Sequence, residues 1–150
     1  MEDASVGALV ALHQQRIADA LPEGTTSVSG STLLGHWSGH DLDLVVLVPS
    51  VTSAAQRLRV VYPPLYEEEW RTDWAAFRDP GPPQVDVVLT TRGSKGDAYH
   101  RRAWELILND DALRDEYERL KAGGMDSTQK AVFFDRVVEM LDTDRGSKSR

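Results

Sequence analysis

The sequence predicts an α/β (α+β) fold, in which a small mixed β-sheet of about four or five strands is flanked by helices and followed by C-terminal helices. Residues 42–48 and 84–90 are apolar and rich in β-branched side chains, which is typical of buried strands. Residues 5–21 carry apolar residues at helical spacing, and so does most of the chain after residue 99. The fold class follows from this mixture of strand and helix patterns.

Length and composition predict a single domain. The chain has 150 residues, of which 41% are hydrophobic, and this is enough for one good core. Residues 143–150 lack an apolar pattern and are typical of a disordered tail. We therefore expect one domain over residues 1–142.

The composition also excludes several classes of function. The chain has no cysteine, so it has no disulfide, thiolate metal site or cysteine nucleophile. Its first residues are acidic and no apolar run approaches the roughly 18 residues of a membrane span, so we expect a cytoplasmic protein without a membrane partner. A net charge of −7 argues against general binding to nucleic acid.

The first helix and strand are predicted from apolar spacing and turn residues. The helix over residues 5–21 ends at Pro22–Gly24, and the β-prone residues 25–29 form the first strand. His13 lies beside the apolar stripe of the helix, where a partly buried structural histidine is favoured over a ligand.

The most informative stretch is residues 30–48, which predicts a small-residue turn, a short helix, a loop and a strand that opens with two aspartates. Asp41 and Asp43 are two residues apart, so both carboxylates point to the same face of the strand. Two like charges at the mouth of a buried strand are costly unless they are neutralised. Hard carboxylate oxygens suit Mg²⁺, so we expect a magnesium site here.

Asp86 and the Gly30–Ser31 turn extend this site. Asp86 lies inside the strand over residues 84–90 and can face the first two aspartates if the two strands are neighbours. Gly30 allows the backbone to approach a phosphate closely, and Ser31 offers a hydroxyl and an N–H. A helix beginning near Ser31 would add its positive end.

The loop before Asp41 holds His36, Trp37 and His40. The histidines could contact a nucleotide or move a proton, although solvated loop histidines are favoured. Trp37 could stack on a base or equally cover the edge of the core.

The middle of the chain is the hardest to interpret. Residues 52–61 predict a helix that the prolines at 63 and 64 end. Residues 67–78 fit either a short helix, with Trp70, Trp74 and Phe77 on one side, or an edge strand pair, and we favour the helix. Residues 79–83 predict a rigid turn.

The last third predicts a loop and three helices. The loop over residues 90–96 contains Arg92 and Lys95, which could contact a triphosphate or belong to an ordinary connection, with equal weight. Asp97 can cap the next helix, and Asp126 or Ser127 can cap the last one. The helices are expected at residues 99–108, 111–121 and 128–141.

The acidic strands resemble the nucleotidyltransferase superfamily, which includes the polymerase-beta type. The resemblance is carried by Gly30–Ser31, Gly35, Asp41–Leu44 and Val85–Val87, in the order and spacing of that superfamily. It implies a nucleotidyltransferase-like sheet with a two-metal site, at which Asp41, Asp43 and Asp86 hold Mg²⁺ and Gly30 and Ser31 bind the terminal phosphates of a nucleoside triphosphate such as ATP. Asp86 could also act as general base on an acceptor hydroxyl.

The helical part resembles the GrpB family, a branch of the same fold. The matching residues are Gly93–Ser94, a Tyr-x-x-Leu-Lys ending at Lys121, and a Lys-x-x-Phe beginning at Lys130. The resemblance implies that Lys121 and Lys130 neutralise phosphate charge, whereas an exposed helix face explains them equally well.

The function that this sequence predicts is Mg²⁺-dependent transfer of a nucleoside monophosphate from a nucleoside triphosphate to a hydroxyl or similar acceptor. Two alternatives remain open. The domain could be a catalytically silent nucleotide- or partner-binding module of the GrpB-like type, or a nucleotidyltransferase component of a toxin–antitoxin pair. The sequence names neither the acceptor nor the preferred nucleotide.

Overall fold

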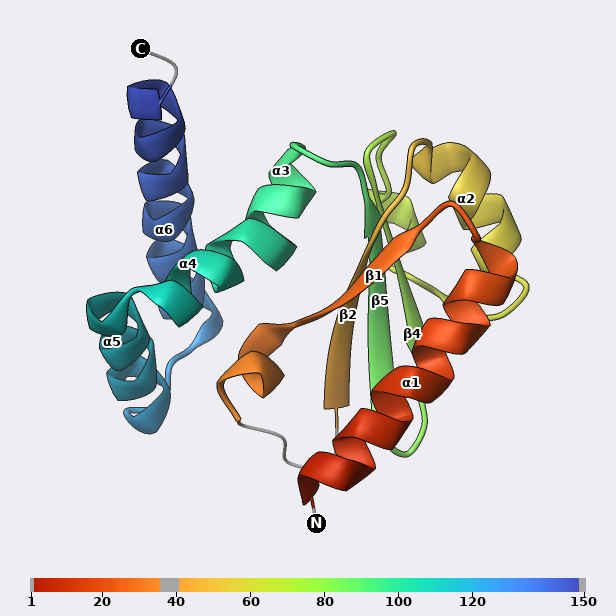
Figure 1. Cartoon of the computed structure of the whole chain (residues 1–150), viewed down its shortest axis with the longest axis horizontal. Helices are drawn as coiled ribbons and strands as arrows, with labels where there is room; N and C mark the ends of the chain where they lie inside the picture. Colours follow the sequence, from red (N-terminus) through yellow and green to blue (C-terminus); the bar gives the residue numbers. More distant parts are fainter. Residues whose placement is uncertain (1, 36–40, 149–150) are drawn as a thin grey trace. The chain divides into compact units, whose positions relative to one another are not determined.

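The computed structural model describes residues 2–35 and 41–148 of the chain (Figure 1). It divides into two compact units, residues 1–97 and residues 98–150, which are described separately below. The first unit is a mixed five-stranded sheet with flanking helices and the second is helical, so the α+β fold class is confirmed. The expected single domain over residues 1–142 and the expected tail remain predictions.

The sheet of the first unit has the strand order β1-β2-β5-β4-β3. The strands are β1 (Thr25–Ser29), β2 (Asp41–Leu47), β3 (Pro64–Leu65), β4 (Trp74–Asp79) and β5 (Gln84–Thr90). The central pair, β2 and β5, is parallel, and the other pairs are antiparallel. A parallel pair needs a long crossover, and here the crossover contains α2, β3 and β4. The two expected strands that carry the aspartates are therefore neighbours.

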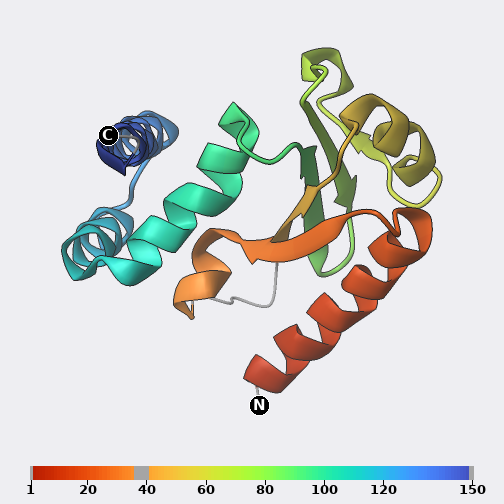
Figure 2. The ribbon, with the colours of Figure 1, turned by 45° about the horizontal axis from the view of Figure 1, so that its top comes forward.

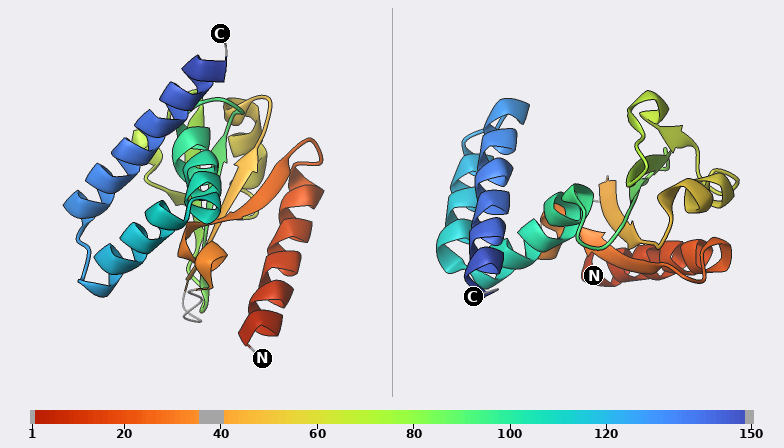
Figure 3. Two further views of the ribbon diagram at one scale, coloured as in Figure 1. Left: turned by 60° about the vertical axis from the view of Figure 1, so that its left-hand side comes forward. Right: turned by 90° about the horizontal axis from the view of Figure 1, so that it is seen from above.

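Helices α1 (Glu2–Ala20) and α2 (Val51–Leu58) cover one face of this sheet (Figure 3). Alternate residues of the strands point to that face because side chains in a strand have a period of two. The buried residues of the core on this face are Ile17, Leu21, Leu42, Leu44, Val46, Val48, Val51, Ala54, Ala55, Leu58, Tyr62, Ala75, Phe77, Val85, Val87 and Leu89.

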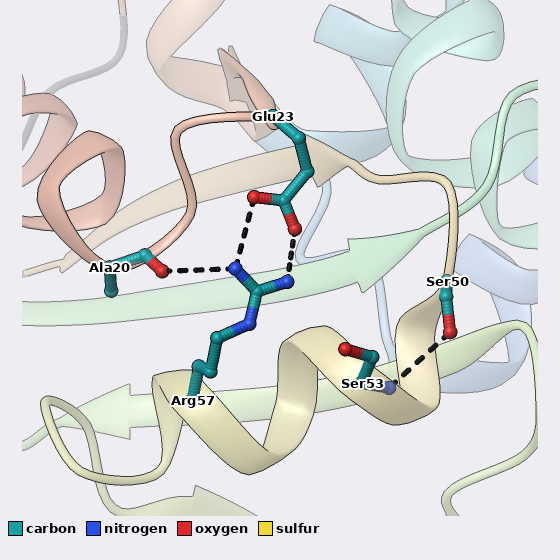
Figure 4. A network of polar contacts seen from close by, with 5 residues as sticks. All are labelled: Ala20, Glu23, Ser50, Ser53 and Arg57. Atoms are coloured by element: carbon teal, nitrogen blue, oxygen red, sulfur yellow. Dashed lines mark hydrogen bonds and ion pairs between the residues drawn. The ribbon is translucent and has the colours of Figure 1, made fainter.

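Polar contacts fix α2 at both ends. The hydroxyl of Ser50 accepts a hydrogen bond from the N–H of Ser53 and caps the helix. Near the other end, Arg57 pairs with Glu23 and donates to the carbonyl of Ala20 (Figure 4). These contacts join α2 to the turn that follows α1.

His13 is buried within the first unit, with 2% of its surface exposed, so the prediction of a structural histidine is confirmed. Its Nδ1 lies 2.6 Å from the hydroxyl of Tyr62. Burial lowers the pKa of His13 and raises the pKa of Tyr62 to about 12. A phenol that keeps its proton and an imidazole without a second proton are complementary partners for one hydrogen bond.

The helix favoured over residues 67–78 is wrong, and the alternative of an edge strand pair is right only in that a strand, β4, begins in this stretch and lies inside the sheet. Only Glu67–Glu69 are helical, as the 3-10 turn η2, and β4 then pairs with β3 and β5. The rings of Trp70 and Phe77 do meet, with centroids 5.1 Å apart, but they meet from a loop and a strand. The spacing of these aromatic residues therefore reflects packing between a loop and a strand, and not the face of a helix.

The second unit consists of helices around an aromatic cluster. They are η3 (Ala98–Arg102, a π-helical turn), α4 (Ala103–Asn109), α5 (Asp111–Ala122) and α6 (Ser127–Lys148). Trp104, Tyr117, Phe133 and Phe134 are buried against one another, and α5 and α6 lie side by side (Figure 3). Asp126 caps α6 by accepting from the N–H of Gln129, as expected.

Candidate functional site

A row of polar residues crosses the sheet on the face opposite α1 and α2. Ser29 of β1 is paired in register with Asp43 of β2, Asp43 with Asp86 of β5, and Asp86 with Arg78 of β4. Register partners in adjacent strands point to the same face, with strands about 4.8 Å apart. The structure thus brings Asp43 and Asp86 together, as the sequence predicted for neighbouring strands.

Asp41 extends this row toward the start of β2. It lies on the same face as Asp43, and its register partner is Gln84. Asp41 and Asp43 are exposed, whereas their neighbours Leu42 and Leu44 are buried on the other face. The beginning of β2 therefore presents two carboxylates to solvent from a strand that the core holds in place.

Gly30 follows β1 directly and lies against Asp43. Its φ is +76°, in the left-handed region that favours glycine. A Cβ at this position would lie 2.7 Å from Oδ2 of Asp43, which is too close for a real contact. The absence of a side chain at Gly30 therefore allows the Asp43 carboxylate to lie against the backbone at this position.

Ser31 lies in η1 (Gly30–Leu34), into which β1 leads directly (Figure 2). This element is a 3-10 turn of 5 residues that ends at Gly35, whose φ is +85°. The short helix expected to begin near Ser31 is present as this 3-10 turn, and so short a turn has little aligned dipole to offer a phosphate. Any phosphate contact would come from local N–H groups and the Ser31 hydroxyl.

Arg78 is the residue of this site that sequence reasoning missed. Its Nε lies 2.7 Å from Oδ1 of Asp86 and one terminal nitrogen lies 2.9 Å from Oδ2, so the guanidinium donates to both carboxylate oxygens. The hydrogen bonds to Asp86 raise the pKa of Arg78. The available signal was the turn at residues 79–83, since a hairpin around it places residue 78 opposite residue 86.

The acidic residues suit one Mg²⁺ that also binds water and substrate, and they do not form a complete set of protein ligands. Within residues 2–35 and 41–148, no three histidine or acidic side chains converge as a set of metal ligands. Mg²⁺ is commonly held by one or two carboxylates together with water and substrate phosphates. Asp41 and Asp43, two exposed aspartates on one face of β2, fit that requirement.

Lys121 and Lys130 lie in the second unit, on α5 and α6, and both are exposed. The ammonium of Lys121 lies 5.9 Å from the ring centroid of Tyr117 within the same unit. This contact gives Lys121 a local partner, and the phosphate-binding role of both lysines remains a prediction.

The loop after β5 is held by hydrogen bonds between its own residues. The Asp97 carboxylate accepts the N–H of Gly93, and the Ser94 hydroxyl accepts the N–H of Asp97. Asp97 is itself the last residue of α3 (Lys95–Asp97), which continues directly into η3, so the expectation that Asp97 caps a following helix is wrong. Arg92 and Lys95 are exposed on that loop. The candidates His36, Trp37 and His40 lie outside the described residues.

The helices of the described part of the chain, residues 2–35 and 41–148, include none that is long and apolar enough to span a membrane. No family model matches the sequence. A protein of Deinococcus radiodurans described as a UPF0157 protein is 30% identical to the chain over 138 residues, which cover 85% of this chain and 72% of the relative. On this similarity over most of both sequences, the chain belongs to the UPF0157 family.

Proposed function

We propose that this protein is a GrpB-like nucleotidyltransferase that acts in the cytoplasm and transfers a nucleoside monophosphate from a nucleoside triphosphate to a hydroxyl or similar acceptor, with Mg²⁺. One observation carries the proposal. Asp41, Asp43 and Asp86 share one face of two parallel strands, and the Asp43 carboxylate lies against a glycine. Carboxylates gathered on one exposed face are ligands for Mg²⁺, which binds them together with water and substrate phosphates.

The chemistry can be assigned to residues. The acceptor oxygen attacks the α-phosphorus, a new oxygen–phosphorus bond forms, and the bond to the β-phosphate oxygen breaks, so that pyrophosphate leaves. Asp41 and Asp43 would hold Mg²⁺, which when bound supplies charge neutralisation and orients the triphosphate. Asp86 would accept the proton of the acceptor hydroxyl, and Gly30 and Ser31 would bind the terminal phosphates. Lys121 and Lys130 are the cations to which the GrpB resemblance gives the role of neutralising phosphate charge.

A second candidate is a nucleotide-binding module that does not transfer. The bidentate ion pair between Arg78 and Asp86 favours it, because the pair uses accepting positions on the carboxylate that would serve as the base. In that case the acidic face would bind a Mg²⁺-nucleotide and signal its presence to a partner.

The first experiment is a calorimetric titration of each Mg²⁺-nucleoside triphosphate into the protein. The Asp41→Asn/Asp43→Asn variant is titrated in the same way. The control is Glu68→Gln/Glu69→Gln, which removes two exposed acidic charges elsewhere in the chain. We expect binding that requires Mg²⁺, is lost in the aspartate variant and persists in the control. Equal binding by all three proteins would refute a nucleotide site at these aspartates.

A second experiment separates transfer from binding. The protein is incubated with Mg²⁺, nucleoside triphosphates and a cell extract as the source of acceptor, and release of pyrophosphate is measured. Release that disappears in Asp86→Asn supports the transferase, whereas tight nucleotide binding without release supports the silent module. Lys121→Ala is expected to weaken triphosphate binding, and Arg119→Ala on the same helix is its matched control.

A further inference from the structure

We infer that Arg78 takes the place of the second cation, so that the acidic face binds one divalent cation, at Asp41 and Asp43, and not two. This inference rests on the proposed function and specifies how its cation site is built. It departs from the two-metal site that the superfamily resemblance implies, because one of the three expected carboxylate ligands has another partner.

The geometry of the Arg78–Asp86 pair is the first support. Arg78 and Asp86 are register partners on adjacent strands, so the backbone of the sheet holds them side by side. Both oxygens of Asp86 accept from the guanidinium, at 2.7 and 2.9 Å. The two side chains are only 35% and 23% exposed, which protects the pair from much of the solvent screening. This is a strong contact that a metal ion would have to break.

Charge balance is the second support. The three aspartates alone would carry three negative charges, which is more than one divalent cation balances. With Asp86 neutralised by Arg78, the remaining pair, Asp41 and Asp43, carries two negative charges, which one divalent cation balances. A second divalent cation beside Asp86 would also lie next to the guanidinium, and like charges at such short range repel.

The chemistry of arginine is the third support. A guanidinium stays protonated in proteins, so the positive charge of Arg78 is permanent. Its planar fork matches a carboxylate in two hydrogen bonds. Unlike Mg²⁺, this cation cannot dissociate, because it is tethered to β4. Arg78 is thus a positioning residue that fixes Asp86 and sets the number of cations.

The test counts bound Mn²⁺, a spectroscopic substitute for Mg²⁺, without using activity. Free Mn²⁺ is measured by electron paramagnetic resonance in the presence of α,β-methylene-ATP, which cannot release pyrophosphate. We expect one Mn²⁺ per chain in the wild-type protein and in Arg78→Lys, which keeps the positive charge. Arg78→Gln releases Asp86 and should bind two, and Arg78→Gln/Asp86→Asn should return to one.

If Arg78→Gln does not fold, the Asp86→Asn variant provides a second test of the inference. The inference predicts that Asp86→Asn binds one Mn²⁺ with the wild-type affinity, because Asp86 is not a ligand. Two Mn²⁺ ions in the wild-type protein, or loss of one ion in Asp86→Asn, would overturn the inference and leave the proposed function standing. No Mn²⁺ in the wild-type protein, with or without the nucleotide analogue, would instead overturn the cation site of the proposed function itself.

Discussion

The two faces of strand β2 differ in what they require of their residues. On one face, Leu42, Leu44 and Val46 are completely buried or nearly so against α1, α2 and the neighbouring strands. On the other face, at the beginning of the same strand, Asp41 and Asp43 are exposed and stand beside Asp86 of β5. A single backbone therefore serves two purposes, because successive side chains point in opposite directions.

This difference separates stability from function. Burial of the apolar face fixes the position and register of β2, since a slip by one residue would place aspartates in the core. The acidic face gains nothing from that burial, and its like charges oppose folding unless they are neutralised. Changes on the apolar face should therefore alter the free energy of unfolding, and changes on the acidic face should alter ligand binding.

The largest effect on stability is expected for Leu44→Ala. Leu44 is 1% exposed, and truncating a buried leucine lowers the free energy of unfolding by about 2–5 kcal/mol through lost burial and the cavity left behind. Urea denaturation measures this loss. The fraction that stays folded should bind Mg²⁺-nucleotide with unchanged affinity. A loss in the free energy of unfolding below about 1 kcal/mol would mean that this face is less tightly packed than the burial of Leu44 indicates.

Gly30→Ala should disturb both properties at once. Its φ of +76° is unfavourable for alanine, so we expect a loss of about 1–3 kcal/mol in the free energy of unfolding. The new Cβ would also displace the Asp43 carboxylate and weaken Mn²⁺ binding. Both changes can be measured on one sample, by urea denaturation and by Mn²⁺ titration.

Gly35→Ala is the matched control for that variant. Gly35 has a similar φ of +85°, but a Cβ there meets no heavy atom of residues 2–35 and 41–148 within 4 Å. It should therefore lose about 1–2 kcal/mol from backbone strain and keep its Mn²⁺ affinity. If Gly35→Ala weakened Mn²⁺ binding as much as Gly30→Ala does, the proximity of Gly30 to Asp43 would have no special role.

The sequence predicts this sheet well where local pattern and tertiary partner agree. Residues 84–90 form β5 as expected, and the apolar run after Asp41 forms β2, because both strands are buried and their composition shows it. The interpretation fails at residues 74–79, where the spacing of Trp74 and Phe77 also fits a helix. That strand exists because β5 is available as a partner, which local spacing cannot reveal.

The same failure explains what was missed at the site. Asp41, Asp43, Gly30 and Ser31 lie close together in the sequence, so their pattern could be recognised. Arg78 enters the site only through the register of the hairpin between β4 and β5, and with residues 67–78 assigned to a helix that register does not exist. A basic residue paired across a sheet can be predicted only after the strand that carries it.

His13 offers a pH-dependent test of the apolar face. Burial lowers its pKa below the ordinary 6.5, with Arg16 adding to the effect and Asp79 opposing it. Below pH 6.5 the unfolded chain therefore binds more protons than the folded protein, and stability falls as the pH falls. Urea denaturation at pH 7.5 and 5.5 should show a decline that is smaller in His13→Gln. An equal decline in both proteins would mean that His13 titrates normally.

Asp43→Asn should have the smallest effect on stability and the clearest effect on binding. Asp43 is exposed and shares its face of β2 with Asp41, so replacing its charge removes a repulsion and leaves the free energy of unfolding within about 0.5 kcal/mol of the wild type, or slightly higher. Binding of Mg²⁺-nucleotide should disappear, because a neutral amide is a weaker ligand for Mg²⁺ than a carboxylate. Thermal melting without metal and calorimetric titration with it separate the two effects. A large drop in melting temperature without metal would show that Asp43 supports the fold. The separation of a stabilising face from a ligand-binding face on β2 would then be wrong at Asp43.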